Sequence, residues 1–218
     1  LPRRDFPVSA LLPAGKRAIQ VAADKAAQGY TSLKWKIGVE APEREIGYAE
    51  RLLDALPATA KLRLDANASL SLNDLDAWLE CLAGSTEKLD YLEQPLAVGE
   101  EVTMAGRMEA SGVPIALDES LNGAQGQSWL APGAWDGPLV VKAPLMGDVY
   151  CLEKRLRGVA DQVVLSSVFE TGIGLENVLS LADGLPELRQ AVGFDTVDAF
   201  DDALQPIESG PEMSIQAR

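Results

Sequence analysis

Short apolar runs alternate with longer amphipathic segments from one end of this 218-residue chain to the other. The short runs have the length and composition of buried strands, and the longer segments repeat their apolar positions with the period of a helix. Eight strands are predicted, at residues 7–12, 31–37, 61–65, 89–93, 114–118, 139–142, 162–167 and 191–197. Seven helices are predicted between them, at residues 16–28, 41–56, 73–82, 102–111, 127–130, 148–160 and 175–189.

This regular alternation predicts an α/β protein with a parallel sheet. Because the elements occupy roughly the length of a TIM-type barrel, about 250 residues, a closed barrel is favoured over an open sheet. No linker or change of composition divides residues 1–200, which we interpret as one barrel domain. The tail at 201–218 is polar and contains proline and glycine, so it is expected to be irregular.

Composition excludes several classes of function. The formal charge is −14, whereas binding to a phosphate backbone needs clustered Lys and Arg, so nucleic acid is not an expected partner. The chain has no histidine, which excludes His-dependent nucleophiles and His-ligated metals. Its two cysteines are isolated, which fits a reducing cytoplasm and not a disulfide scaffold. No apolar run is long enough to cross a bilayer, so no membrane partner is expected.

Charged residues stand at the ends of five consecutive predicted strands, from the second to the sixth. In parallel barrels, the C-terminal ends of the strands carry the catalytic groups. Each residue alone is most often a solvated charge or a turn residue, but their joint placement predicts one site. Lys34 and Lys36 are two positions apart, so both side chains point to the same face of their strand. The full set is Lys34, Lys36, Asp65, Glu93, Asp118 and Lys142.

Three carboxylates at one rim repel one another, and a divalent cation relieves that repulsion. Oxygen ligands on rigid strands suit Mg²⁺, and Mn²⁺ can substitute for it, so Asp65, Glu93 and Asp118 are the predicted ligands. The flanking lysines balance the negative charge of the carboxylates, so the site can accept a small anionic carboxylate substrate. Lys34 and Lys36 are expected to lower each other's pKa toward the range of a base. The predicted reaction is proton abstraction α to a carboxylate, with the cation stabilising the developing negative charge.

The motifs K-W-K, R-L-D-A-N, Y-L-E-Q-P, D-E-S and V-K-A-P occur in this order along nearly the whole chain. With them, the chain resembles the enolase superfamily, in its muconate-lactonising subgroup with a lysine on each side of the site. The resemblance implies a TIM-type (β/α)7β barrel, which has seven helices and not eight. It also implies a lysine base and Mg²⁺, the known chemistry of these enzymes.

Two later segments narrow the resemblance. L-S-S-V-F-E-T-G-I-G at 165–174 and V-G-F-D-T at 192–196 resemble the o-succinylbenzoate synthase family. This implies dehydration of 2-succinyl-6-hydroxy-2,4-cyclohexadiene-1-carboxylate in menaquinone or phylloquinone synthesis. It further implies that Lys36 removes the proton and then protonates the departing hydroxyl, beside Lys34 as an electrostatic neighbour. Lys142 is implied over the opposite face of the ring. The implied substrate contacts are Ser166, Ser167 and Gly193 for the succinyl carboxylate, and Arg63 and Asn67 near the ring substituents.

Other activities remain open on this scaffold. An N-succinylamino acid racemase needs lysines on both faces of an α-carbon, and this chain has them. A dipeptide epimerase is disfavoured, because F-D-T-V-D at 194–198 lacks the D-x-D pattern that holds a substrate ammonium. A Schiff-base aldolase leaves the three carboxylates without a purpose. The N-terminal capping domain of the superfamily is expected to be absent from this chain, so an inactive barrel that serves as a binding module is the alternative from another class.

Overall fold

The structure is a computed structural model that describes residues 4–197 and 209–214. Its strands run parallel in the order in which they occur along the chain. The larger sheet contains β2 (Ser9–Leu12), β3 (Ser32–Lys36), β4 (Lys61–Asp65), β5 (Leu89–Glu93) and β6 (Ile115–Ala116). A second sheet pairs β7 (Leu139–Val141) with β8 (Val163–Leu165).

Isolated parallel bridges join the two sheets into a closed barrel. Leu117 pairs with Leu139 and so connects β6 to β7. On the other side, residues 192–193, here called the closing segment, bridge β8 and the residue before β2 through the pairs Ser166–Gly193 and Val8–Val192. The ring therefore has eight strand positions, as the (β/α)7β architecture requires, and the predicted fold class is confirmed.

The eighth strand position is shorter than predicted. A strand was expected at 191–197, and the bridges of the closing segment are formed by residues 192–193. The amide of Ser9 donates to the carbonyl of Val192 (2.8 Å), so the ladder begins normally. At the next step, the amide of Leu11 donates to Oδ2 of Asp195 (2.9 Å) and not to a backbone carbonyl. A side chain thus takes over the acceptor role, and the regular ladder ends after two residues.

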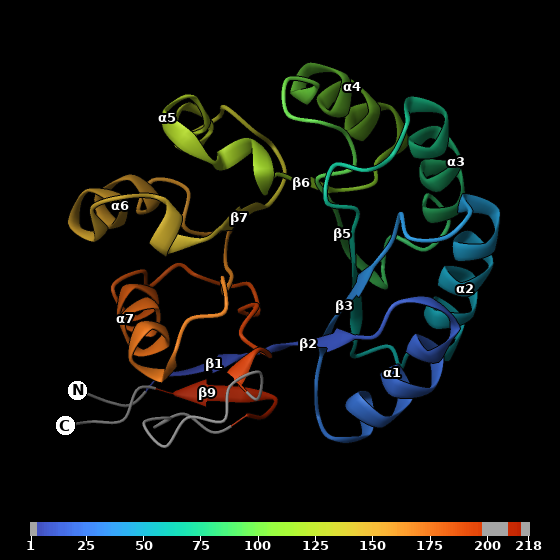
Figure 1. Cartoon of the computed structure of the whole chain (residues 1–218), viewed down its shortest axis with the longest axis horizontal. Helices are drawn as coiled ribbons and strands as arrows, with labels where there is room; N and C mark the ends of the chain where they lie inside the picture. The colour runs from blue at the N-terminus through green and yellow to red at the C-terminus, as the bar shows by residue number, and fades with distance from the viewer. Residues whose placement is uncertain (1–3, 198–208, 215–218) are drawn as a thin grey trace.

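Within residues 4–197 and 209–214, seven helices follow one another around the outside of the strands (Figure 1). Gly184 and Pro186 end the last of them earlier than predicted, because glycine and proline do not continue a helix. Four short 3-10 turns lie in the loops that the structure describes in full, and the helix predicted at 127–130 is one of them. The helices are α1 (Ala18–Ala27), α2 (Pro42–Ala55), α3 (Leu72–Leu82), α4 (Glu101–Ser111), α5 (Gly123–Gly126), α6 (Val149–Leu156) and α7 (Gly172–Asp183). The turns are η1 (Gly15–Arg17), η2 (Glu119–Leu121), η3 (Gln127–Leu130) and η4 (Ala143–Leu145).

The tail contains a strand that was not expected. Within the segment predicted to be irregular, β9 (Glu212–Ser214) pairs antiparallel with β1 (Asp5–Pro7), and Phe6 lies opposite Met213. Both of these side chains are buried, which explains the pairing by apolar contact with the core. In Figure 1 this pair lies between α7 and α1. Residues 198–208 and 215–218 lie outside the described part of the chain.

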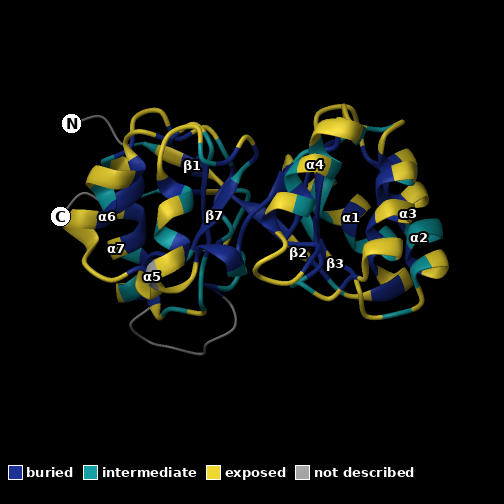
Figure 2. Ribbon diagram, turned by 90° about the horizontal axis from the view of Figure 1, so that it is seen from above, coloured by how far each residue is buried: buried dark blue, intermediate teal, exposed yellow. Residues whose placement is uncertain are grey.

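The two faces of each strand have different surroundings. On β3, Leu33 and Trp35 are fully buried in the main core, whereas Lys34 and Lys36 between and beyond them point into a pocket. Figure 2 shows that buried residues concentrate in the strands and that exposed residues lie mainly on the helices and loops. A separate small cluster of inward side chains fills the barrel, one each from β5 to β8: Tyr91, Ala116, Val140 and Val164. In the described residues, no helix is long and apolar enough to cross a membrane.

Candidate active site

A pocket of about 490 Å³ opens at the C-terminal ends of the strands. The lysines predicted for the site, Lys34, Lys36 and Lys142, all line it, together with Asp65. The strand register explains part of this arrangement, because Lys36 on β3 is the direct neighbour of Asp65 on β4. Asp65 in turn pairs with Glu93 on β5, so three charged residues from three strands stand side by side.

Lys34 is held by two carboxylates. Its Nζ lies 2.8 Å from Oδ2 of Asp65 and 2.6 Å from Oε1 of Glu93. Burial lowers the pKa of Lys34, but the charges of Glu93 and Asp65 outweigh burial, and the pKa lies above its ordinary value. The expectation that Lys34 and Lys36 depress each other's pKa is therefore wrong for Lys34. Two carboxylates within hydrogen-bonding distance have more effect on it than a neighbouring ammonium.

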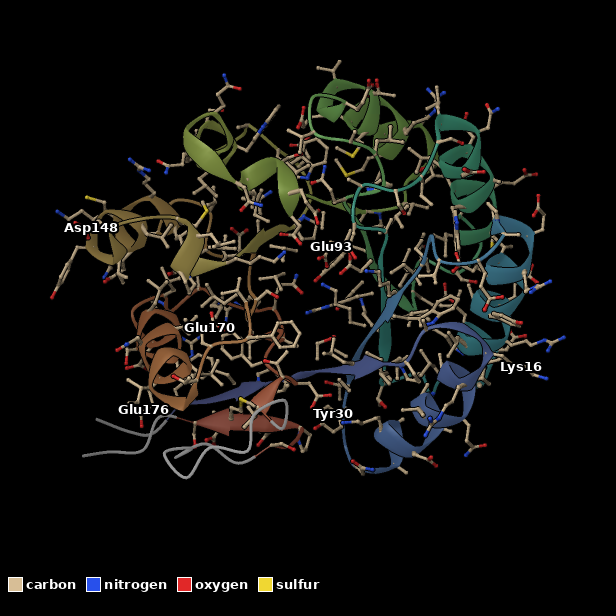
Figure 3. All side chains as sticks on the ribbon, in the orientation of Figure 1. Lys16, Tyr30, Glu93, Asp148, Glu170 and Glu176 are labelled. Carbon is tan, nitrogen blue, oxygen red and sulfur yellow. The ribbon has the colours of Figure 1, made fainter. Side chains whose placement is uncertain are left out.

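Glu93 is fully buried and does not line the pocket. Burial raises its pKa to about 8, with further raising by the charges of Asp65 and Asp118 and a lowering effect of the Lys34 ammonium. Figure 3 shows Glu93 inside the ring of strands, whereas Lys16 and Asp148 lie toward its outside.

Asp118 makes the corresponding contact on the other side of the site. Its Oδ2 lies 2.5 Å from Nζ of Lys142, and the residue is 1% exposed. One oxygen of each buried acid, Glu93 Oε2 and Asp118 Oδ1, has no hydrogen-bond partner in the part of the chain that the structure describes. Buried carboxylate oxygens without a partner are costly, so these two atoms are available to a cation.

The predicted metal ligands are only partly assembled. Among residues 4–197 and 209–214, no three acidic or cysteine side chains surround one point closely enough to hold a metal ion. Asp65 and Glu93 are adjacent through the strand register, and Asp118 interacts electrostatically with Glu93. The donor chemistry, oxygen only and with two unpartnered buried atoms, fits Mg²⁺.

Lys36 differs from the other two lysines. Its side chain is exposed to the pocket, and it forms no ion pair with any described residue. It is the lysine of the site whose amine is not bound to a carboxylate. An amine in this position is free to approach a bound substrate.

Four of the five predicted substrate residues line the pocket. They are Asn67, Ser166, Ser167 and Gly193. A Cβ on Gly193 would come within 2.8 Å of the Ser166 Oγ, which explains why glycine stands there. Asn67 has a positive φ of 44°, and its side-chain amide donates to Oε1 of Glu119 (3.2 Å).

Arg63 is the exception, and the prediction that it contacts the ring substituents is wrong. It is 1% exposed, and its guanidinium donates to Oδ2 of Asp90 and to the carbonyl of Ala191, both at 2.8 Å. The guanidinium also lies 5.0 Å from the centre of the Tyr91 ring. Arg63 and Asp65 share the inward face of β4, but Arg63 is two residues earlier and lies one layer deeper in the barrel.

Several residues of the site were not predicted. Gln94 is fully buried and hydrogen-bonds the backbone of Asp118, while Glu119 bonds Asn67 and has its pKa raised by burial and by the charge of Asp118. Thr196 and Phe169 line the pocket. All four belong to motifs that were recognised in the sequence, but residue type alone does not reveal which motif residue bonds a neighbouring loop.

A parallel barrel with acid–base side chains around a pocket at its C-terminal end has the construction of a barrel enzyme. A sequence profile of the enolase C-terminal domain-like family matches residues 17–138, more than half of the chain. The chain therefore belongs to the enolase C-terminal domain-like family, and the resemblance to the enolase superfamily is confirmed.

Individual relatives agree with this assignment. The chain is similar to the o-succinylbenzoate synthase of Thermosynechococcus vestitus, with 37% identity over 214 residues that cover 91% of this chain and 66% of that protein. The crystal structure of o-succinylbenzoate synthase from Thermosynechococcus elongatus, complexed with Mg in the active site, matches with a TM-score of 0.78 and 35% identity over 93% of this chain and 64% of that chain. A substrate-liganded L-Ala-D/L-Glu epimerase from Bacillus subtilis matches with a TM-score of 0.78 over 98% of this chain and 62% of that chain; at 18% identity this shows the fold alone. The chain thus spans less than two thirds of the length of these relatives.

Proposed function

We propose that the protein is an o-succinylbenzoate synthase, a carbon–oxygen lyase that converts 2-succinyl-6-hydroxy-2,4-cyclohexadiene-1-carboxylate to 2-succinylbenzoate in menaquinone or phylloquinone biosynthesis. One observation carries the proposal. Three lysines, Lys34, Lys36 and Lys142, line one pocket at the C-terminal ends of the strands, and buried carboxylates bind two of them. The 37% identity to a synthase supports the same substrate.

The reaction needs one group that both removes and returns a proton. In our proposal, the neutral amine of Lys36 takes the proton from the carbon next to the substrate carboxylate. The resulting ammonium then donates this proton to the hydroxyl on the adjacent carbon, the C–O bond breaks, and water leaves as the ring becomes aromatic. The lysine returns to its starting state. The exposure of Lys36 to the pocket, without an ion pair among the described residues, supports this role.

Lys142 acts from the opposite side. It follows β7, which is four strand positions from β3 in a ring of eight, so a substrate in the pocket lies between Lys36 and Lys142. An ammonium over the second face of the ring stabilises the negative charge that develops when the proton leaves. Lys34 adds positive charge beside Lys36 and stays protonated through its two carboxylates.

Asp65, Glu93 and Asp118 are the residues that would hold Mg²⁺. When bound, the cation supplies positive charge close to the substrate carboxylate and so lowers the cost of forming a carbanion-like state. The two unpartnered oxygens of Glu93 and Asp118 support this assignment.

The proposal is tested by incubating the purified protein with the cyclohexadiene carboxylate in the presence of Mg²⁺ or a chelator. We expect formation of 2-succinylbenzoate with Mg²⁺ and none with the chelator. Lys36→Ala should abolish both turnover and exchange of the α-hydrogen with solvent deuterium. Lys61→Ala is the matched control, because Lys61 is exposed at the opposite end of β4. Turnover that survives chelation would reject the metal, and α-hydrogen exchange that survives Lys36→Ala would reject the base.

A second activity, N-succinylamino acid racemase, is favoured by the same pair of lysines on two sides of the pocket. It is tested with N-succinyl amino acids, whose optical rotation is followed with and without Mg²⁺. Inversion without dehydration of the cyclohexadiene would replace the leading proposal. Binding of 2-succinylbenzoate without turnover of either substrate would indicate a binding module instead.

A further inference from the structure

The turn that follows β8 forms one wall of the pocket and contains a strained residue. Residues 166–169 all line the pocket, and Phe169 is 59% exposed. Its φ is 63°, in the left-handed region, which is unfavourable for a bulky side chain. Such a conformation persists only when neighbouring contacts hold it. Figure 3 shows Glu170 beside this turn, across the ring from Glu93.

The carboxylate of Glu170 holds the turn from behind. Its Oε2 accepts hydrogen bonds from Oγ of Ser167 (2.7 Å) and from the amide of Val168 (2.8 Å). Its Oε1 is buried without a partner among the described residues, so the hold depends on one oxygen. Bonds to an ionised carboxylate are about twice as strong as bonds between neutral groups.

The hydroxyl of Ser167 is fully used in this network. It accepts from the amide of Phe169 and from Oγ1 of Thr196, both at 2.8 Å, and it donates its single proton to Glu170. A hydroxyl has one proton and two lone pairs, so none remains for a ligand. Ser167 therefore does not donate from its side chain to a substrate carboxylate in this arrangement, contrary to the role expected for it. Ser166, also in the pocket, makes no side-chain hydrogen bond within the described residues.

Gly174 provides independent evidence that Glu170 has a fixed place. It is the third residue of α7, and in the interior of a helix glycine is about 1 kcal/mol less favourable than alanine. A Cβ at this position would come within 2.8 Å of the Glu170 Cβ and 3.2 Å of its Cγ. The helix thus contains a residue that weakens it and leaves space for the Glu170 side chain.

We propose that Glu170 is a positioning residue that fixes residues 167–169 as the wall against which the substrate binds, with Gly174 as the position that accommodates it. This inference rests on the proposed dehydration for its substrate, but the network itself does not depend on that reaction. Because the wall contacts the ligand and not the reacting proton, loss of Glu170 should weaken substrate binding and leave the chemical step nearly unchanged.

The experiment compares Glu170→Ala, Glu170→Gln and Gly174→Ala with the unmodified protein. Glu170→Ala should raise KM about tenfold and change kcat less than about threefold. Glu170→Gln keeps an acceptor oxygen for both donors and should restore most of the affinity. Gly174→Ala should also raise KM, although alanine favours the helix. The matched control is Gly106→Ala in α4, where an added Cβ meets nothing within 4 Å and KM should stay unchanged.

A second readout does not require turnover. The amides of Val168 and Phe169 should exchange slowly with deuterium in the unmodified protein and at least about tenfold faster in Glu170→Ala and Gly174→Ala. If the unmodified protein does not dehydrate the cyclohexadiene, the proposed function fails, and exchange together with the affinity for 2-succinylbenzoate still decides the role of Glu170. Equal KM, or equal ligand affinity, in Glu170→Ala and the unmodified protein would overturn the inference, as would a Gly174→Ala variant that behaves like Gly106→Ala.

Discussion

Replacing Gln94 with leucine tests whether a buried amide joins two strand ends of the site. Gln94 follows Glu93 directly and is fully buried. Its Oε1 accepts from the amides of Asp118 (3.0 Å) and Ser120 (3.1 Å). Its Nε2 donates to the carbonyl of Leu96 (3.0 Å) and to Oγ of Ser120 (2.8 Å). All four hydrogen bonds therefore connect the end of β5 with its own loop and with the end of β6.

The expected loss follows from these four bonds. A buried intramolecular hydrogen bond contributes about 1 kcal/mol net, and a buried partner that is left unsatisfied costs about 1–3 kcal/mol. Leucine has a similar size and removes every bond of Gln94, so we expect the free energy of unfolding to fall by about 3–5 kcal/mol. The total for a domain is about 5–15 kcal/mol, so the loss is large enough to measure without ambiguity.

Urea denaturation followed by circular dichroism measures this difference. Gln28→Leu is the control, because Gln28 is exposed and its substitution should change stability by less than about 0.5 kcal/mol. The amide also holds the backbone of Asp118, so the affinity for Mg²⁺ measured by calorimetry should fall in Gln94→Leu as well. A loss of stability below about 1 kcal/mol, with unchanged Mg²⁺ affinity, would refute the reasoning.

Three further predictions concern two ion pairs and the two thiols. Arg63→Leu removes one partner of a buried ion pair and should cost about 3–5 kcal/mol in urea denaturation; a cost below about 1 kcal/mol would contradict the contacts described for it. Burial lowers the pKa of Lys25, but the hydrogen bond and the charge of Asp195 raise it, and the pKa lies above the ordinary value of 10.5. A base with a raised folded-state pKa stabilises the fold below its unfolded pKa, so the stability difference between the unmodified protein and Lys25→Met should be constant from neutral pH to about pH 10 and decline above it. A difference that instead declined near pH 7 would exclude this ion pair as the cause. Exposed Cys151 should react with iodoacetamide before the half-buried Cys81, because burial raises the pKa of the Cys81 thiol. Mass spectrometry of the peptides measures the order of labelling, and earlier labelling of Cys81 would contradict the prediction.

Much of the barrel is predictable from the pattern of the chain, because its period decides which face of a strand is buried. The strands predicted at 61–65 and 89–93 coincide with β4 and β5 at both ends. Each of these strands ends in a carboxylate, Asp65 or Glu93. The strand predicted at 191–197 was not recovered in the same way. There, the Asp195 side chain replaces a backbone acceptor, and no rule of periodicity anticipates that exchange.

The site was predictable to the level of strand ends and not beyond. The positions of Lys34, Lys36 and Lys142 in one pocket follow from strand direction and alternation alone. Alternation does not show how deep a side chain lies within the barrel. Arg63 was therefore predicted to line the pocket, whereas it is buried below the pocket. The hydrogen bonds of the Ser167 hydroxyl do not follow from the sequence either. They depend on distances to Glu170, which is near in the chain, and to Thr196, which is far from it.

The closing segment has a consequence for how the chain acquires its shape. Leu11 in β2 must pair with Asp195, 184 positions later, so the barrel cannot close until residues up to Asp195 have left the ribosome. Until then, β2 and the most recently made strand are both unpaired edges, and an unpaired edge attracts strands of other molecules. Contacts of such long range also slow folding. The nascent chain is therefore most exposed to aggregation just before its last strand position arrives, and a chaperone that shields β2 during synthesis should increase the yield of native protein.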